Sequence, residues 1–158
     1  LDYQLGFEEL ILQKAMAWTE KRLGIFILPG LLHPMSTNGQ AENVLSFSNI
    51  CLDLDQAGSD KVVAHLKSHG MPPSLIVNSG SLSDDGVAKK HVYWRLKEPV
   101  DDTGRIGQLR LKLACSLGGD KSFERISQVI RLPGTINFKH DQDMPAMISE
   151  QNGYEYEL

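Results

Sequence analysis

The stretch ICLDLDQ, residues 50–56, places two aspartates at the end of an apolar segment with strong β preference. Side chains at i and i+2 point to the same face of a strand, so Asp53 and Asp55 share a face. Two carboxylates at this spacing repel each other and lose hydration, which is unfavourable unless a cation or a basic group lies between them. Alternatively, the strand simply ends here and Asp55 begins the turn DQAGSD, where it caps the following helix.

Length and composition limit the class of protein. The chain has 158 residues, of which 41% are hydrophobic, and no run of eighteen apolar residues. We therefore expect one globular domain over residues 1–158, with a sizeable core and no membrane span. The segment LDYQLGFEEL at residues 1–10 has neither an initiator Met nor the pattern of a signal peptide, so we expect an excised piece of a larger protein. Cys51 and Cys115 form no CxxC pair, which favours the reducing cytoplasm over a disulfide framework or a cysteine-based zinc site.

A local basic segment contrasts with the acidic whole. The net charge of the chain is −4, which by itself disfavours a nucleic-acid partner. Residues 86–139 nevertheless carry a charge of +6, because five acidic residues stand against eleven basic ones: Lys89, Lys90, Arg95, Lys97, Arg105, Arg110, Lys112, Lys121, Arg125, Arg131 and Lys139. Such a field can hold phosphates although the whole chain is acidic. The alternative is a set of ordinary solvated helix faces.

Hydrophobic periodicity and breakers predict an α+β fold. The expected helices span 7–22, which is amphipathic, 59–69 with Ser59 as N-cap and Gly70 as C′, 102–118, and a short segment around 122–130. The expected strands cover 24–30, which we expect to be buried, the segment that carries the two aspartates, 74–78, 91–97, 134–139, 146–150 and 154–158. The close succession of the strands at 74–78 and 91–97 favours α+β over a purely parallel βαβ array.

Several polar residues are candidates to join the aspartate pair. Ser79 and Gly80 end one expected strand and His91 begins the next, so they could offer backbone N–H groups and an imidazole to a phosphate chain. Taken alone, His91 could equally be a half-buried strand histidine bonded to a neighbour. Asp120 follows a Gly-Gly helix end, where it could cap the next helix or supply a third carboxylate. Carboxylate oxygens from Asp53, Asp55 and Asp120 would suit Mg²⁺ or Mn²⁺.

The stretch RISQVIRLPGTINFK, residues 125–139, makes these candidates specific. It resembles the third conserved block of the archaeo-eukaryotic primase (AEP) superfamily, in particular the RepB-like primase-polymerases of plasmids and phages. The family signature Arg-x-Pro-Gly-Thr-x-Asn-x-Lys corresponds to Arg131 through Lys139. The family's Asp-x-Asp motif is matched by Asp53 and Asp55.

The second family motif, Ser-Gly followed by His, is matched by Ser79, Gly80 and His91, and a Pro-Pro-Ser at 72–74 precedes that strand as in many members. The order and spacing of these motifs over residues 43–139 argue against a chance match. The sequence departs from the pattern in two places. Ten residues separate Gly80 from His91, where the family often has two or three, and the zinc-binding Cys/His knuckle of some relatives is missing.

The resemblance implies a catalytic RRM-like sheet joined to an N-terminal α/β module. It also implies a DNA primase or polymerase, a nucleotidyltransferase that makes or extends primers on a single-stranded DNA template. In that role Asp53, Asp55 and Asp120 would hold two Mg²⁺ or Mn²⁺ ions. His91, with Ser79 and Gly80, would contact the triphosphate of the incoming NTP or dNTP, and Arg131 and Lys139 would contact further phosphates or the template.

Two other functions use the same residues. A catalytically silent module could keep the fold in order to bind a replication origin or a single strand, and a metal-dependent nuclease could direct the same carboxylates at phosphodiesters. For the primase-polymerase, the expected partners are template, primer, nucleotide and a fused or separate helicase, in a cytoplasmic protein of a plasmid or phage system. Of the two neighbours Tyr93 and Trp94, we expect one to face the active cleft and the other to pack in the core.

Overall fold

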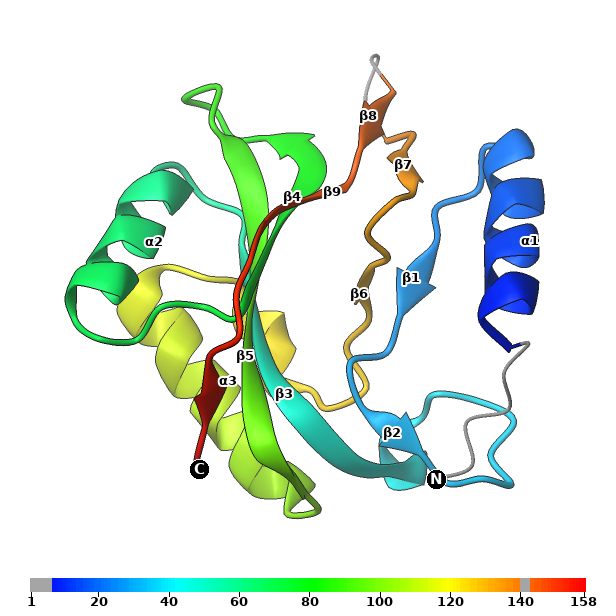
Figure 1. Cartoon of the computed structure of the whole chain (residues 1–158), viewed down its shortest axis with the longest axis horizontal. Coiled ribbons are helices and arrows are strands. Elements are labelled where there is room, and N and C mark those ends of the chain that lie inside the picture. The colour runs from blue at the N-terminus through cyan, green and yellow to red at the C-terminus, as the bar shows by residue number, and fades with distance from the viewer. Residues whose placement is uncertain (1–6, 140–142) are drawn as a thin grey trace.

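The computed structural model describes residues 7–139 and 143–158. Its main sheet follows the path β2 (Leu31–Leu32), β3 (Val44–Leu54), β5 (Ala88–Val100), β4 (Leu75–Leu82) and β9 (Met147–Gln151), and β10 (Glu155–Tyr156) pairs parallel with β5 beyond the end of β4. Helices α2 (Ser59–Ser68) and α3 (Thr103–Leu117) cover one face of this sheet (Figure 1). On the other side lie the helix α1 (Phe7–Glu20) and two short ribbons, β1 (Phe26–Ile27) with β6 (Ile130–Arg131) and β7 (Ile136–Asn137) with β8 (Met144–Pro145). This mixed arrangement confirms the predicted α+β class.

Strand β5 is the centre of the sheet, because β3 and β4 both pair with it in antiparallel register. Asp53 and Val77 both lie opposite His91, and in the next row on the same face Cys51 and Leu75 lie opposite Tyr93. Residues directly opposite one another share a face, and the face alternates along each strand. The aspartate and histidine motifs therefore lie on the sheet face turned away from α2 and α3.

Each face of the sheet has its own apolar cluster. The larger one fills the space under α2 and α3 and contains Leu52, Leu54, Val92, Trp94 and Ile106, all at most 6% exposed. The smaller one lies on the opposite face. It joins Cys51, Val77 and Tyr93 to Phe123 of the 3-10 helix η2 (Lys121–Glu124) and to Ile130. Trp94 is therefore the core residue of the Tyr-Trp pair, and Tyr93 faces the other way.

Several predicted boundaries need correction. Gly58, in the left-handed conformation with φ of 85°, is the N-cap of α2, so the assignment of Ser59 as the cap is wrong; the Ser59 hydroxyl donates to the carbonyl of Ala88 instead. The helix expected at 122–130 is only the short η2. The strand expected at 24–30 is only β1, which Pro29 and Gly30 separate from β2, and Phe26 and Ile27 are exposed rather than buried. Another 3-10 helix, η1 (Ala41–Asn43), directly precedes β3.

The helix predicted at 7–22 is present as α1, but its apolar residues do not face a core. Leu10, Ile11 and Trp18 are each between 44% and 55% exposed, because α1 stands at the outer edge of the molecule (Figure 1). Just beyond the helix, Arg22 donates two hydrogen bonds to Asp143, at 2.7 and 2.8 Å, and lies over the ring of Phe138. Within residues 7–139 and 143–158, no helix is long and apolar enough to cross a membrane.

Candidate active site

Asp53 and Asp55 lie at the end of β3, where the sheet face is only partly shielded from water. The Asp53 side chain is 24% exposed. Burial, followed by the charges of Asp55 and Asp120, raises the pKa of Asp53 to about 7, and the nearby Lys89 ammonium opposes this shift. One oxygen of Asp55, Oδ1, is buried and has no hydrogen-bond partner among the described residues. The protein therefore gathers carboxylates here, and the Lys89 ammonium offsets their repulsion only in part.

The Gly-Gly sequence after α3 carries Asp120 to this pair. Gly118 ends the helix in the left-handed conformation with φ of 74°, and Gly119 then lies against β3. A Cβ on Gly119 would stand 2.6 Å from a Leu52 methyl and 2.9 Å from the Asp53 carbonyl oxygen, so only glycine fits. The next amide, that of Asp120, donates to this same Asp53 carbonyl at 2.8 Å. Asp120, which follows the end of α3 in the sequence, therefore lies beside Asp53 at the end of β3.

Asp120 caps the following helix, which was one of the two expectations, and it lies close to Asp53; its part in metal binding stays a prediction. Its carboxylate caps η2 by accepting hydrogen bonds from the amide and the hydroxyl of Ser122. Its charge is also close enough to raise the pKa of Asp53. A capping carboxylate is held in a fixed place, so the cap itself orients this third acidic group.

His91 lies across from Asp53 on the central strand. Its Nε2 is 3.8 Å from Asp53 Oδ1, its side chain is 5% exposed, and its Nδ1 has no hydrogen-bond partner among the described residues. Burial, with a smaller effect from the Arg131 charge, lowers the pKa of His91 to about 4. The imidazole is therefore neutral at pH 7 and has one ring nitrogen unsatisfied, unlike a structural histidine bonded on both sides.

The Ser79–Gly80 motif is joined to the Arg-x-Pro-Gly-Thr-x-Asn block by Asn137, which is 3% exposed. The Asn137 amide donates to the Gly80 carbonyl at 3.0 Å and to the Ser81 hydroxyl at 2.7 Å. Its oxygen accepts from the Arg131 guanidinium at 3.0 Å. Gly80 has φ of 75°, and a Cβ there would stand 2.6 Å from the Met144 carbonyl. Two motifs more than fifty residues apart therefore form one unit.

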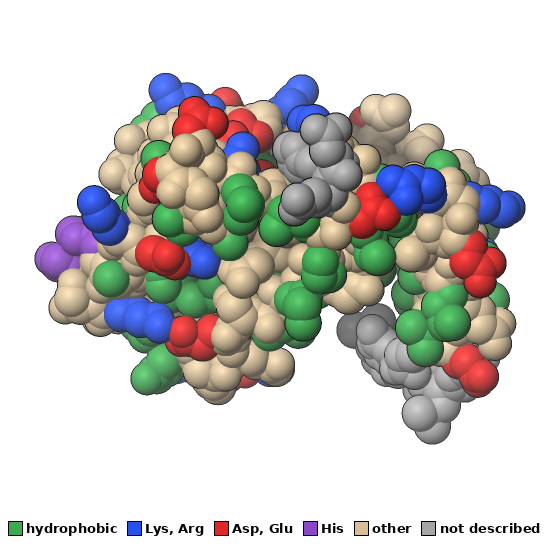
Figure 2. Space-filling model, turned by 90° about the horizontal axis from the view of Figure 1, so that it is seen from above, with side chains coloured by type: hydrophobic (Ala, Val, Ile, Leu, Met, Phe, Trp, Pro, Cys, Tyr) green, Lys and Arg blue, Asp and Glu red, His purple; other side chains and the backbone are tan. Residues whose placement is uncertain are grey.

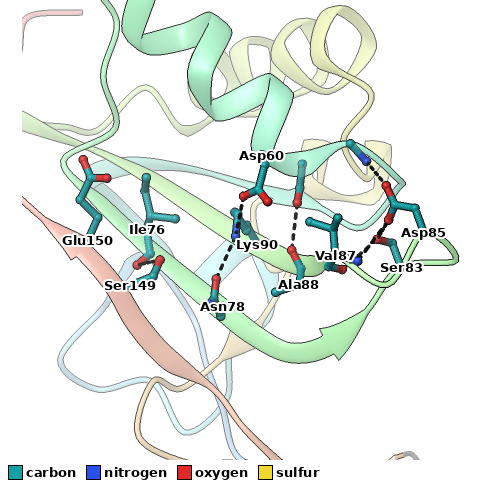
Figure 3. A network of polar contacts seen from close by, with 12 residues as sticks. Asp60, Ile76, Asn78, Ser83, Asp85, Val87, Ala88, Lys90, Ser149 and Glu150 are labelled. Atoms are coloured by element: carbon teal, nitrogen blue, oxygen red, sulfur yellow. Dashed lines mark hydrogen bonds and ion pairs between the residues drawn. The ribbon is translucent and has the colours of Figure 1, made fainter.

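The long insertion between Gly80 and His91 does not displace the motif. Strand β4 continues to Leu82 and β5 starts at Ala88, so the extra residues extend the β4–β5 hairpin outward. Figure 3 shows how this hairpin is tied to α2: Lys90 pairs with Asp60 at 3.1 Å and donates to Asn78 at 3.0 Å, while Asp85 accepts from the Gly58 amide at 3.0 Å. The insertion is a structural extension of the sheet.

Arg131 and Lys139 lie at different depths. The Arg131 guanidinium is half-buried, stacks over Phe26 with 4.7 Å to the ring centroid, and is close enough to His91 to lower the pKa of that imidazole. Lys139 is exposed, and its amide donates to Asn137 Oδ1 at 3.1 Å. Arg131 is therefore placed beside the histidine, whereas Lys139 extends from the rim.

The carboxylates fit a hard divalent ion by their chemistry, but they do not enclose one as the side chains stand. Oxygen donors and concentrated negative charge are what Mg²⁺ and Mn²⁺ require. Among the described residues, however, no group of three or more His, Cys, Asp and Glu side chains surrounds a common point. Both Asp120 oxygens accept hydrogen bonds from Ser122. The three carboxylates are therefore candidate ligands, and their binding of an ion stays a prediction.

Comparison with solved structures identifies the architecture. The AEP domain of the primase-polymerase of cyanophage S-2L matches with a TM-score of 0.71 and 20% identity, over 92% of this chain and 71% of that one. The fold is that of an AEP domain. Primase RepB' matches with a TM-score of 0.65 and 14% identity, over 92% of this chain and 45% of that one. The catalytic domain of RepB' in complex with initiator DNA matches at 0.64 and 16%, over 92% and 68%.

This likeness confirms the AEP fold that the sequence resemblance implied, with the aspartate-bearing sheet at its centre. The chain spans less than half the length of the first of the two RepB' structures. Neither the family models nor the curated proteins compared with the sequence match it.

The basic segment at 86–139 does not form one continuous patch on the AEP fold. Lys90 is 9% exposed, Arg110 is fully buried over the Phe47 ring, and Lys97 pairs with Glu157. Arg95 pairs with Glu155 but keeps 71% of its side chain exposed. Figure 2 shows Lys and Arg interspersed with Asp and Glu over the face seen from above. The sequence count therefore overstates the positive field available to phosphates.

Lys89 was not among the site residues predicted from the sequence, and Tyr93 was predicted only as one of two alternatives to face the cleft. Lys89 lies two positions before His91, and its charge acts on Asp53. Tyr93 lies two positions after His91, and its buried hydroxyl has no partner among the described residues. Period-two spacing on either side of His91 in KKHVYW is the signal that could have placed both beside the carboxylates.

Proposed function

We propose that this domain is a DNA primase-polymerase, a template-directed nucleotidyltransferase that makes or extends primers on single-stranded DNA with NTPs or dNTPs. One observation carries the proposal: Asp53, Asp55 and Asp120 gather on the sheet face where a neutral, partly unsatisfied His91 lies across from Asp53. A site built to bind a divalent ion and a triphosphate needs both features. The AEP fold supports the same activity.

In this proposal each residue has a chemical role. The three carboxylates would hold two Mg²⁺ or Mn²⁺ ions, which when bound activate a primer 3′-hydroxyl and neutralise charge on the α-phosphate and pyrophosphate. Because its imidazole is neutral, His91 can donate one hydrogen bond to a triphosphate oxygen without burying a second charge. Ser79 and Gly80, which Asn137 holds in place, would offer polar groups on the neighbouring strand. Arg131 would add positive charge beside His91.

A single assay tests the activity. The wild-type domain and an Asp53→Ala/Asp55→Ala variant are incubated with primed and unprimed single-stranded template, Mg²⁺ or Mn²⁺, and labelled NTPs or dNTPs. We expect the wild type to incorporate nucleotide and the folded variant to incorporate none. Equal incorporation by the two proteins would refute the assignment of the carboxylates.

The same gels separate the other two candidate functions. A silent origin- or strand-binding module would bind the template and leave it unextended. Among the described residues no group of three or more ligating side chains is preformed, which is compatible with such a module. A nuclease would shorten the template in a reaction that needs Asp53 and Asp55.

A further inference from the structure

A polar hollow beside the carboxylate site lies on the same sheet face and is not used by the proposed chemistry. It has a volume of about 460 Å³ and crosses four strands, β3, β5, β4 and β9. Its walls follow two rows of the sheet. Tyr93 lies in the row with Leu75 and Gln151, and Arg95 lies opposite Asn49 in the next row. Both rows continue the line that starts at Asp53 and His91.

Two residues that line this hollow, Asn49 and Tyr93, each carry a buried polar atom without a hydrogen-bond partner among the described residues. Asn49 donates through its amide to the Pro29 carbonyl at 3.0 Å, but its Oδ1 and the Tyr93 hydroxyl have no hydrogen-bond partner among the described residues. A buried polar atom without a partner is unfavourable, so such atoms call for an explanation. A ligand that donates to the Asn49 oxygen and bonds the Tyr93 hydroxyl would satisfy both.

The remaining lining identifies the chemistry of that ligand. Leu75 and Ile148 provide an apolar floor, and Asn152, Gln151 and the serines provide neutral hydrogen-bonding groups. Arg95, whose side chain is 71% exposed, provides a guanidinium that pairs with Glu155 at 3.1 Å. No carboxylate of the described residues lines the hollow itself. An apolar floor, amides and one guanidinium match the base, sugar and phosphate of a nucleotide.

We propose that this hollow binds one nucleotide unit of the single strand held by the domain. This inference rests on the proposed function, because it places the strand next to the carboxylates. The rows of Tyr93 and Arg95 lie two and four residues along β5 from His91, which is roughly 7–13 Å. A unit in the hollow is thus a neighbour of the reacting nucleotide, bound through its own phosphate and base.

Binding of a labelled single-stranded oligonucleotide, measured in EDTA so that no divalent ion contributes, tests the proposal. Tyr93→Phe removes only the unpartnered hydroxyl, and we expect it to weaken strand binding about two- to tenfold. Arg95→Ala should reduce the slope of log K against log salt by about 0.7, the share of one phosphate. Lys97→Ala is the matched control, because it also breaks an ion pair with a C-terminal glutamate but lies outside the hollow. It should bind like the wild type.

Other outcomes overturn the proposal. If Tyr93→Phe and Arg95→Ala melt and bind the strand as the wild type does, the hollow holds no part of the strand. If only the affinity for free labelled dNTP falls, the hollow belongs to the incoming nucleotide instead. Primer extension separates this failure from failure of the proposed function. Incorporation with unchanged strand binding refutes only the hollow, whereas hollow-dependent binding without incorporation refutes only the polymerase.

Discussion

At the scale of single residues, Asp53 shows a site whose charge opposes folding. Its pKa in the folded protein, about 7, is above the ordinary value near 4, so folding favours the protonated form. The resulting destabilisation is absent below pH 4, grows as the pH rises, and is complete above pH 7. Such a cost is typical of functional groups, because burial and repulsion that disfavour the apo protein favour a bound cation.

We therefore predict that Asp53→Asn stabilises the metal-free protein. The gain in unfolding free energy should be on the order of 1–3 kcal/mol at pH 8 and smaller at pH 5, because the amide keeps the shape and removes the charge. Thermal melts in EDTA at the two pH values measure it. Asp84→Asn, in the exposed turn of the β4–β5 hairpin, should change little at either pH. A lower melting temperature for Asp53→Asn at pH 8 would show that the carboxylate is satisfied in the folded state.

His91 allows a kinetic prediction. If its neutral imidazole bonds the triphosphate, His91→Ala should raise KM for nucleotide and lower kcat, because the lost donor serves both substrate binding and the charge that develops on pyrophosphate. Steady-state kinetics at several nucleotide concentrations, with melting curves, measure both constants. His69→Ala, at the end of α2 behind the sheet, is the control and should match the wild type. A His91→Ala protein that loses thermal stability but keeps both constants would make His91 a packing residue.

At the scale of elements, the end of α3 decides where the third carboxylate lies. We predict that Gly119→Ala destabilises the domain by about 1–3 kcal/mol, because the new methyl group meets Leu52 and the Asp53 carbonyl at 2.6 and 2.9 Å. It should also reduce incorporation per folded molecule, since relief of the clash moves Asp120 away from Asp53. Urea unfolding and primer extension measure the two effects.

The chain offers a matched control for this change. A Cβ added at Gly153 would have no atom within 4 Å, and this residue has no positive φ, so Gly153→Ala should be nearly neutral in both assays. If Gly119→Ala behaves like Gly153→Ala, the close approach of α3 to β3 does not constrain the site.

At the scale of the whole molecule, the distribution of charge predicts a modest salt dependence. If all eleven basic residues of 86–139 met phosphates, the slope of log K against log salt for a single strand would be about −8. The structure leaves Lys89, Arg131 and Lys139 near the carboxylate face, with Arg95 in the hollow, so we expect about −2 to −3. Titrations at several salt concentrations measure the slope.

Single substitutions test the same point. Lys139→Ala should make the slope shallower by about 0.7, whereas Lys112→Ala, on α3 behind the sheet, should leave it unchanged. A steep slope that also depends on Lys112 would mean that the strand binds across the helices, and the assignment of the carboxylate face would then be wrong.

The sequence by itself determined the local features of this protein. Period-two spacing put Asp53 and Asp55 on one face, apolar periodicity located α1, α2 and α3, and the ordered motifs implied the AEP fold that the structure shows. The bounds of short strands were predicted poorly. The strands β1, β7 and β10 lie within predicted strands but have only two residues each, and β2, β6 and β8 were not predicted, because such short strands depend on their partners rather than on intrinsic preference. Ser59 failed as a cap because its hydroxyl finds the Ala88 carbonyl, a contact made only after β5 packs beside α2.

Only the tertiary structure decided which residues meet. The register of β3 on β5 sets His91 across from Asp53, the packing of Gly119 on β3 brings in Asp120, and Asn137 joins Gly80 to the Arg131 block. It also decided which charges are free, by burying Arg110 and pairing Lys90 with Asp60. The physical reason is that periodicity fixes the face of a side chain within one element. Register, close approach and burial arise from contacts between elements far apart in the chain, which no local pattern records.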